Sequence, residues 1–354
     1  MNQKLTEQEI FEIENTRPHV VILGAGATIA TIPNGDRNGC ACSVMHGFVK
    51  NLGLESILSS VKLSTKSDNI EEIYSELYER GEECKQVREQ LEEAIYSYFS
   101  RLQLPDKITI YDEVILALTS KDIITTFNWD PLLIQAYNRA KQITSNLPKL
   151  AFPHGNVAAG FCNKCGHFGA LQRKICDNCG NIYQRAPLLY PVKNKDYNSN
   201  PFIRHQWANL SEFLCRAKMI TIFGYSAPKT DIEAARMLKE AFEKYLPAQR
   251  FNHIDIIERP NFDHDELSNT WREFITDANC YYEIHESFYD SYLAKSPRRT
   301  VECLYKRNNG GWWDDSKINF KKEDSWDDVQ KKLIPLLMEE KSGKKVLEVN
   351  PATP

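Results

Sequence analysis

Short apolar runs, separated by longer amphipathic stretches, dominate the hydrophobic pattern of this chain. A run with no polar position, such as Val20–Leu23, is typical of a strand that is covered on both faces. Strands of this kind that alternate with helices predict a parallel, doubly wound α/β sheet. The runs that predict strands are residues 20–23, 123–126, 149–154, 219–223, 253–258 and 280–284.

Between the first two predicted strands, the pattern changes to the helical spacing. Ile70, Ile73 and Leu77 recur every three or four residues, with charged residues between them. We therefore expect a helical insertion over residues 43–105, whose aromatic positions belong to a core. Further helices are predicted over residues 132–141, 202–216, 267–275 and 329–338, with another beginning near Thr230. Residues 291–354 are expected to form a partly helical C-terminal extension with a loose tail.

Composition narrows the classes of function. Hydrophobic residues make up 42% and charged residues 26% of 354 residues, which is ordinary for a globular protein with a sizeable core. A net charge of −4 argues against a whole-surface attraction to nucleic acid. No apolar run approaches the ~20 residues that span a bilayer, and the polar N-terminus is no secretory signal. We expect a cytoplasmic protein whose ten cysteines are thiols or metal ligands.

Polar side chains follow the predicted strand over residues 123–126. Asn128 and Asp130 stand where open α/β sheets bind ligands, at the carboxyl end of a strand. Asp130 has an equally good structural explanation, because Pro131 follows it and Asp-Pro is a common helix start. Neither a helix cap nor a core requires Asn128, which makes it the stronger candidate for ligand contact.

A glycine-containing turn, Gly24–Thr28, follows the first predicted strand. Glycines there allow the backbone to approach a pyrophosphate, and the next helix offers free N–H groups to it. A plain strand-to-helix turn would use the same residues, and the complete G-x-G-x-x-G pattern is absent. The polar loop over residues 32–39 is a candidate lid in which Arg37 reaches a phosphate or carboxylate, or is simply a surface residue.

Three further strand ends carry candidate residues. His154 precedes Gly155, and an imidazole suits a general base because it titrates near neutrality. Gly224 and Ser226 follow the strand over residues 219–223, where they would lie beside a phosphate or ribose or form a simple link. Glu258 ends the next strand and is placed to accept hydrogen bonds from a ribose.

Four cysteines give the sharpest local signal. Two C-x-x-C pairs are separated by ten residues, and a glycine follows the second cysteine of each pair. This pattern predicts a structural zinc ribbon over residues 160–185. Four protein ligands leave no open coordination position, so we do not expect catalysis by the metal. The ligands are Cys162, Cys165, Cys176 and Cys179.

Taken in order, these motifs resemble those of the sirtuin superfamily, and more closely its bacterial sirtuin-like branch, over residues 18–285. Gly24–Thr28 resembles the nucleotide motif G-A-G-I/A-S, and Thr126–Asp130 is similar to T-Q-N-x-D. His154-Gly155 is similar to the catalytic H-G, and the four cysteines follow it as in the family. Gly224–Ser226 looks like the later G-T/Y-S. The resemblance implies a Rossmann-like NAD-binding domain over residues 18–290.

NAD chemistry at the nicotinamide ribose is what the resemblance implies. The nicotinamide bond would break through an oxocarbenium-like species. Asp130 would hold the carboxamide, Asn128 would order the ribose or the attacking water, and His154 would activate a ribose hydroxyl or that water. From the residues and the resemblance together, the candidate NAD-contacting residues are Gly24, Ala25, Gly26, Thr28, Asp36, Arg37, Asn128, Asp130, Gly224, Ser226 and Glu258.

Two departures from the family affect the expected reaction. The lid keeps Ile32-Pro33 and Asp36-Arg37 of I-P-D-F-R, but the aromatic residue that shields the reacting ribose is missing. After the ribbon, Tyr190–Lys193 replaces the F-G-E-type segment that pairs with an acyl-lysine peptide, which removes part of a β-augmentation partner. Both changes favour hydrolysis of NAD over deacylation.

We therefore expect an NAD+ glycohydrolase that releases nicotinamide and ADP-ribose. The resemblance implies a role in bacterial antiviral defence by NAD depletion. Such an activity must be restrained, which implies homo-oligomerisation or a partner ATPase or sensor, with residues 43–105 as the candidate contact. The alternatives are an NAD-dependent protein deacylase or ADP-ribosyltransferase, and a non-catalytic sensor of NAD or ADP-ribose. Neither a membrane nor direct nucleic-acid binding is expected.

Overall fold

The structure of this protein is a computed structural model, and its description covers most of the chain. The described residues are 12, 15–42, 48–190, 200–225, 236–240, 253–263, 265, 267, 270–271, 281–308 and 317–343. Within them, no helix is both long and apolar enough to cross a membrane. Ser226, the start of the helix predicted near Thr230, most of the helix predicted over 267–275 and the expected C-terminal tail lie outside the described residues.

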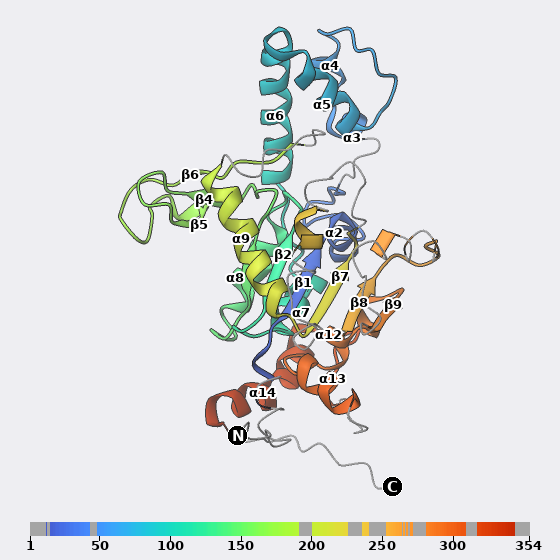
Figure 1. Cartoon of the computed structure of the whole chain (residues 1–354), viewed down its shortest axis with the longest axis vertical. Helices are drawn as coiled ribbons and strands as arrows, with labels where there is room; N and C mark the ends of the chain where they lie inside the picture. Colours follow the sequence, from blue (N-terminus) through green and yellow to red (C-terminus); the bar gives the residue numbers. More distant parts are fainter. Residues whose placement is uncertain are drawn as a thin grey trace, which may run out of the picture.

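A parallel sheet forms the centre of the molecule (Figure 1). Its strands are β1 (His19–Leu23), β2 (Ile123–Thr126), β3 (Lys149–Ala151), β7 (Met219–Phe223), β8 (His253–Ile257) and β9 (Tyr281–His285). The strand order is β3-β2-β1-β7-β8-β9, and all neighbouring pairs are parallel. The chain thus winds outward from β1 in one direction and from β7 in the other, which confirms the predicted doubly wound fold.

The six strands predicted from the apolar runs are all present. The third is shorter than predicted, because it ends at Ala151 rather than at His154. Pro153 has no backbone N–H to give to a ladder, and the N–H of Phe152 is already donated to the side chain of Gln206. The residues from Phe152 to His154 are therefore released from the sheet and form the loop that carries the histidine.

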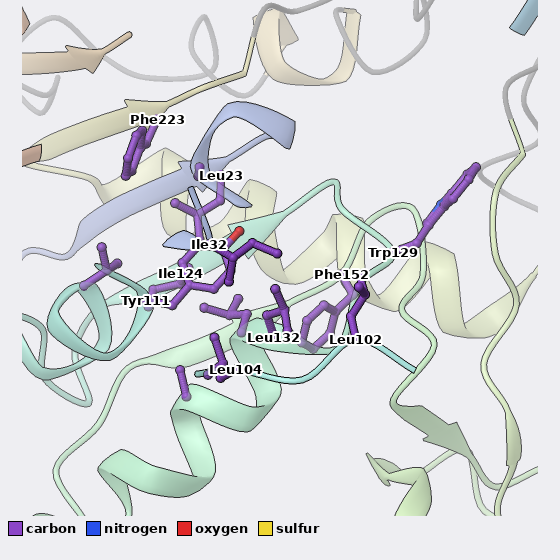
Figure 2. Close-up of a cluster of buried hydrophobic side chains, with 14 of the residues drawn as sticks. Leu23, Ile32, Leu102, Leu104, Tyr111, Ile124, Trp129, Leu132, Phe152 and Phe223 are labelled. Carbon is purple, nitrogen blue, oxygen red and sulfur yellow. The ribbon is translucent and has the colours of Figure 1, made fainter. Parts of the chain in front are cut away.

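Helices cover both faces of this sheet. The helices that share core clusters with the strands include α2 (Ala25–Thr31), α7 (Ile110–Leu116), α8 (Leu132–Ala140) and α9 (Pro201–Arg216). Val21 and Leu23 of β1 pack with α7 and α8, whereas Val20 and Ile22 pack with α9. Alternate residues of a strand point to opposite faces, so a strand buried on both needs an unbroken apolar run. Figure 2 shows part of the cluster on the α7–α8 face, including Leu23, Ile124 and Leu132.

The helical insertion stands out from the sheet (Figure 1). It contains α3 (Phe48–Leu52), α4 (Glu55–Leu58), α5 (Ile70–Glu79), a short 3-10 helix (Gly81–Cys84) and α6 (Lys85–Ser100). The predicted stripes are buried: Ile70, Ile73 and Leu77 on α5, with Val87 and Leu91 on α6. This cluster is continuous with the core on the α7–α8 face, so the insertion is anchored to the body by apolar packing.

A small antiparallel sheet carries the four cysteines, with the strand order β5-β4-β6. Its strands are β4 (Ala159–Phe161), β5 (Phe168–Ala170) and β6 (Gln184–Arg185). Toward the C-terminus, the chain forms a 3-10 helix (Phe288–Asp290), α12 (Tyr292–Lys295), α13 (Thr300–Asn308) and α14 (Trp326–Ser342). The longest of these, α14, includes the predicted helix over 329–338, starts at a capping box and buries its apolar stripe in the main core.

Candidate functional site

Two glycine turns meet at the point where the strand order of the sheet reverses. One follows β1 and the other follows β7, the neighbouring strands at which the winding reverses. The Gly24 N–H donates to the Phe223 carbonyl and the Gly26 N–H to the Gly224 carbonyl, each at 3.0 Å. A Cβ atom on Gly24 would lie 2.4 Å from the Gly224 oxygen. These glycines are therefore required for the close approach of the two turns, at the crevice where this class of sheet binds dinucleotides.

A buried polar network joins α2 to the end of β2. The Thr28 hydroxyl donates to Asp130 Oδ2 at 2.8 Å and lies 2.8 Å from the Tyr111 hydroxyl. Asn128 Nδ2 donates to Thr28 Oγ1 at 2.8 Å and to the Gly24 carbonyl at 2.7 Å. Three of the sequence-predicted residues, Thr28, Asn128 and Asp130, are thus brought into one hydrogen-bonded group beside the glycine turns.

The nitrogen and the oxygen of the Asn128 carboxamide differ in their contacts. Its Nδ2 hydrogens bond to Gly24 and Thr28, which fixes the orientation of the side chain. No donor from the described part of the chain reaches Oδ1, and Asn128 is only partly buried. An amide oxygen accepts hydrogen bonds, so Oδ1 is a fixed acceptor for a hydroxyl group or a water molecule.

Asp130 is fully enclosed, and both carboxylate oxygens have partners. Oδ2 accepts from Thr28, and Oδ1 accepts from the Leu132 N–H at 3.0 Å, where α8 begins. Helix α8 starts at Leu132, as predicted, and its N-cap residue is Pro131 rather than Asp130. Burial raises the pKa of the Asp130 carboxyl, although the hydrogen bond from Thr28 opposes this rise. The Asp130 side chain thus has two roles: it caps the start of α8 and it orients Thr28.

His154 lies on the loop after β3, next to the end of β2. Its ring packs edge-on against Phe127, with ring centroids 4.8 Å apart, and Phe127 in turn stacks on Tyr225 at 4.4 Å. Asn156 connects the two loops, because its Nδ2 donates to the Asp130 carbonyl at 2.6 Å. The imidazole and the Asn128 network therefore belong to adjacent loops at the same edge of the sheet.

The other predicted nucleotide contacts are distributed unevenly. Both Asp36 carboxylate oxygens accept backbone N–H groups of the loop and of Gln103, at 2.8 to 3.0 Å, so this side chain organises the loop. Arg37 forms an exposed ion pair with Asp106 at 3.2 Å. Glu258 follows β8 and accepts the N–H of the next residue at 2.9 Å. Ala25 is exposed in the first turn of α2.

Sequence reasoning missed Tyr111 and Asn156. Tyr111 is fully buried on α7, and burial together with the nearby Asp130 carboxylate raises the pKa of its phenol. In the sequence, this tyrosine is one more aromatic residue in a helical stripe, so only the fold reveals its contact with Thr28. Asn156 follows Gly155 and therefore resembles an ordinary turn residue, although its side chain links two loops of the site.

The four cysteine sulfur atoms converge, as the spacing predicted. All lie within 4.8 Å of one another, with Cys162 Sγ 3.5 Å from Cys179 Sγ and Cys165 Sγ 3.6 Å from Cys176 Sγ. A tetrahedral zinc ion with sulfur ligands at about 2.3 Å places its ligands about 3.8 Å apart. The donor set and its spacing therefore fit one Zn2+ ion.

The two C-x-x-C turns have the same backbone geometry. Gly166 and Gly180 have positive φ angles of 71° and 72°, and each donates its N–H to the carbonyl of the first cysteine of its pair. Cys162 N–H bonds to the His167 carbonyl at 2.8 Å, and Cys176 N–H bonds to the Asn181 carbonyl at 2.7 Å. This repetition aims both pairs of thiols at one centre. His167 is occupied elsewhere, since Nδ1 bonds to the Tyr183 hydroxyl at 2.8 Å.

Comparison with known proteins found matches among solved structures. No protein-family model matches the chain, and no curated protein matches it. The chain is similar to a structure described as the structural basis for the mechanism and regulation of Sir2 enzymes. The sequence identity is 13%, the match covers 84% of this chain and 98% of that chain, and the TM-score is 0.39. The chain is also similar to Sir2 bound to an acetylated peptide and to Sir2 with a p53 peptide and NAD+, each with 14% identity, 86% and 99% coverage, and a TM-score of 0.32. Because both the sequence identity and the TM-score are low, these matches say nothing about activity.

Proposed function

We propose that the protein is an NAD+ glycohydrolase that cleaves NAD+ to nicotinamide and ADP-ribose. The observation that carries this proposal is the Asn128 amide oxygen, held open at the point where the winding of the sheet reverses. Strands are added outward from β1 on one side and from β7 on the other, and dinucleotides bind at the crevice where the strand order of such a sheet reverses. The short motifs that resemble those of sirtuins favour NAD as the dinucleotide.

The proposed reaction breaks the bond between nicotinamide and ribose, and water captures the resulting oxocarbenium-like sugar. Asn128 Oδ1 would accept a hydrogen bond from the attacking water or from a ribose hydroxyl, and His154 would take up the proton that the water releases. Thr28 and Tyr111 hold Asn128 and Asp130 in place through the buried network. The direct carboxamide contact proposed for Asp130 would require its carboxylate to share or exchange the partners that it has here.

Contacts after the cysteine ribbon support hydrolysis over deacylation. The Leu189 N–H is already donated to the His154 carbonyl at 2.9 Å, so it is not offered to a peptide strand. Tyr190 stacks on Tyr74 of α5 with centroids 5.1 Å apart and also contacts Trp129. The helical insertion thus packs on Tyr190, the described first residue of the segment that takes the place of the peptide-pairing motif.

We propose that the insertion also regulates the site. Tyr96 of α6 donates to the Val157 carbonyl at 2.8 Å, and Val157 follows His154 on the loop after β3. Arg185, on β6, pairs with Glu93 of α6 at 2.7 Å. A second copy of the chain, or a partner ATPase or sensor, could act on the loop by binding the insertion. The proposed biological role is NAD depletion in bacterial antiviral defence, in the cytoplasm, with structural zinc in the ribbon.

An NAD-dependent deacylase or ADP-ribosyltransferase is the second candidate. It is favoured by the complete four-cysteine cluster, because the corresponding ribbon helps to form the peptide cleft in the family that the motifs resemble. The third candidate, a sensor that binds NAD or ADP-ribose without turnover, would use the same residues for binding alone.

The test is nicotinamide release by the purified full-length chain, with NAD+ alone and with an acetylated peptide added. We expect release without peptide, at least 100-fold less release from Asn128→Ala, and a normal rate from Asn138→Ala, a matched change on α8. Release that strictly requires the peptide would establish the deacylase instead. Tight NAD+ binding without turnover, with or without peptide, would select the sensor.

A further inference from the structure

A second cluster of metal-ligating side chains lies at the β8–β9 edge of the sheet, away from the cysteine ribbon. His253 and Asp255 are two residues apart on β8, and Glu283 and His285 are two residues apart on β9. The parallel register places Asp255 directly opposite Glu283. Because residues two apart on a strand share a face, all four side chains project from the same side of the sheet.

The donor atoms of His253, Asp255 and Glu283 lie close enough to one another to share a metal ion, and His285 lies next to two of them. Asp255 Oδ1 lies 3.0 Å from His253 Nε2 and 3.2 Å from His285 Nε2. Glu283 Oε2 lies 4.0 Å from His285 Nε2, and the ligand atoms of His253, Asp255 and Glu283 are all within 4.8 Å of one another. Ligands about 2.1 Å from a metal are about 3.0 Å apart at a right angle and about 3.4 Å apart at the tetrahedral angle.

Charge at this place also favours a cation. Asp255 is completely buried and faces a second carboxylate across the strand pair, an arrangement of like charges that destabilises a sheet. Arg307 pairs with Glu283 Oε1 at 3.2 Å and thereby offsets one of the two negative charges.

We propose that His253, Asp255 and Glu283 bind one divalent first-row transition-metal ion, with His285 beside Asp255 and Glu283. Imidazole nitrogen together with carboxylate oxygen suits Zn2+, Mn2+ or Fe2+, whereas Mg2+ and Ca2+ prefer oxygen ligands alone. The oxygens that face away from the cluster are already held: Asp255 Oδ2 accepts the Tyr292 N–H at 2.9 Å, and Glu283 Oε1 pairs with Arg307. Such outer partners orient ligands and are a regular part of metal sites.

The position of the cluster gives the ion a route and a role. Strand β9 is at the edge of the sheet, and the Glu283 side chain is 37% exposed, whereas that of His253 is 3% exposed. An ion would therefore approach from the solvent side of β9 and bind against the buried side of β8. Once bound, it would connect β9 to β8 and, through Asp255 and Tyr292, to the first turn of α12.

The experiment measures metal content and spectra of the full-length chain. Metal-depleted protein is loaded with Zn2+ or Co2+ alone, passed through a desalting column, and analysed by elemental mass spectrometry. Co2+ distinguishes the two centres, because thiolate ligands give strong charge-transfer bands and nitrogen and oxygen ligands give weak visible bands. The test variant is Glu283→Gln with His285→Gln, and the matched control is Glu286→Gln, an exposed acid directly after the same strand.

We expect two ions per chain in the wild type and in Glu286→Gln, and one ion, with only the thiolate spectrum, in the double variant. Near-ultraviolet circular dichroism of the double variant shows whether it keeps its fold. A wild-type chain that holds only the cysteine-bound ion overturns the proposal. Equal loading of a folded double variant, or a second Co2+ ion with thiolate bands, overturns it too.

Discussion

Glu113 provides the sharpest quantitative test of the structure. It lies on α7 with 1% of its surface exposed; Oε2 accepts the Tyr289 hydroxyl at 3.0 Å, while Oε1 has no hydrogen-bond partner among the described residues. Burial raises the pKa of this carboxyl from 4.5 to about 8, although the hydrogen bond from Tyr289 opposes the rise. At neutral pH the folded protein therefore favours the protonated acid.

The direction of the pH effect follows from these two pKa values. Between pH 4.5 and about 8 the folded chain keeps a proton that the unfolded chain has released, so the free energy of unfolding falls as pH rises. Each pH unit inside this window corresponds to about 1.4 kcal/mol. Between about pH 5 and about pH 8 the loss from this single group is on the order of 3 kcal/mol.

Glu113→Gln removes the titration and keeps the shape of the side chain. We expect its free energy of unfolding, relative to the wild type, to rise by about 3 kcal/mol between about pH 5 and about pH 8. Urea unfolding at both pH values measures this change. Glu89→Gln, on the exposed side of α6, should shift the difference by less than about 0.5 kcal/mol. If Glu113→Gln loses stability with pH as steeply as the wild type, the carboxyl is ionised in the folded state and the reasoning fails.

Two further predictions concern the glycine turns and the ribbon. Gly24→Ala should cost about 1–3 kcal/mol and weaken NAD+ binding, because the new Cβ would meet the Gly224 carbonyl although the φ angle of −113° suits alanine. Thermal unfolding and calorimetric titration with NAD+ measure the two effects; an unchanged melting temperature would contradict the contact. Cys165→Ser should lose the thiolate-bound zinc and become sensitive to protease within residues 160–185, whereas Cys215→Ser on α9 should do neither. Equal digestion of these two variants would count against a metal-stabilised ribbon.

The strands could be predicted because double burial leaves a simple record in the sequence. Val20–Leu23 has no polar position, and both faces of β1 are indeed covered. The convergence of Thr28, Asn128 and Asp130 was also predictable, since each follows a strand of one parallel sheet. The C-x-x-C spacing predicted the sulfur cluster equally well, because each pair forms a local turn.

Other features depend on contacts that no local pattern records. Tyr111 and Asn156 join the site through the packing of α7 and of the loop after β3. The link that Asp36 makes from its own loop to Gln103 joins residues that are distant in the sequence. The metal-binding character of His253 and Asp255 depends on the register of β8 with β9, which neither strand specifies alone.

The path of the chain around the ribbon has an evolutionary consequence. A side chain at Gly155 would collide with the Pro187 carbonyl, so the segments that leave and re-enter the body touch each other. The two segments that connect the ribbon to the body therefore form a closed neck at Gly155 and Pro187. The length of the ribbon does not affect the distance between these two segments. Insertions or deletions in the turns between the two cysteine pairs would therefore not change the distance that the body must span. Homologues can thus be expected to vary most there while they retain the glycine at the neck.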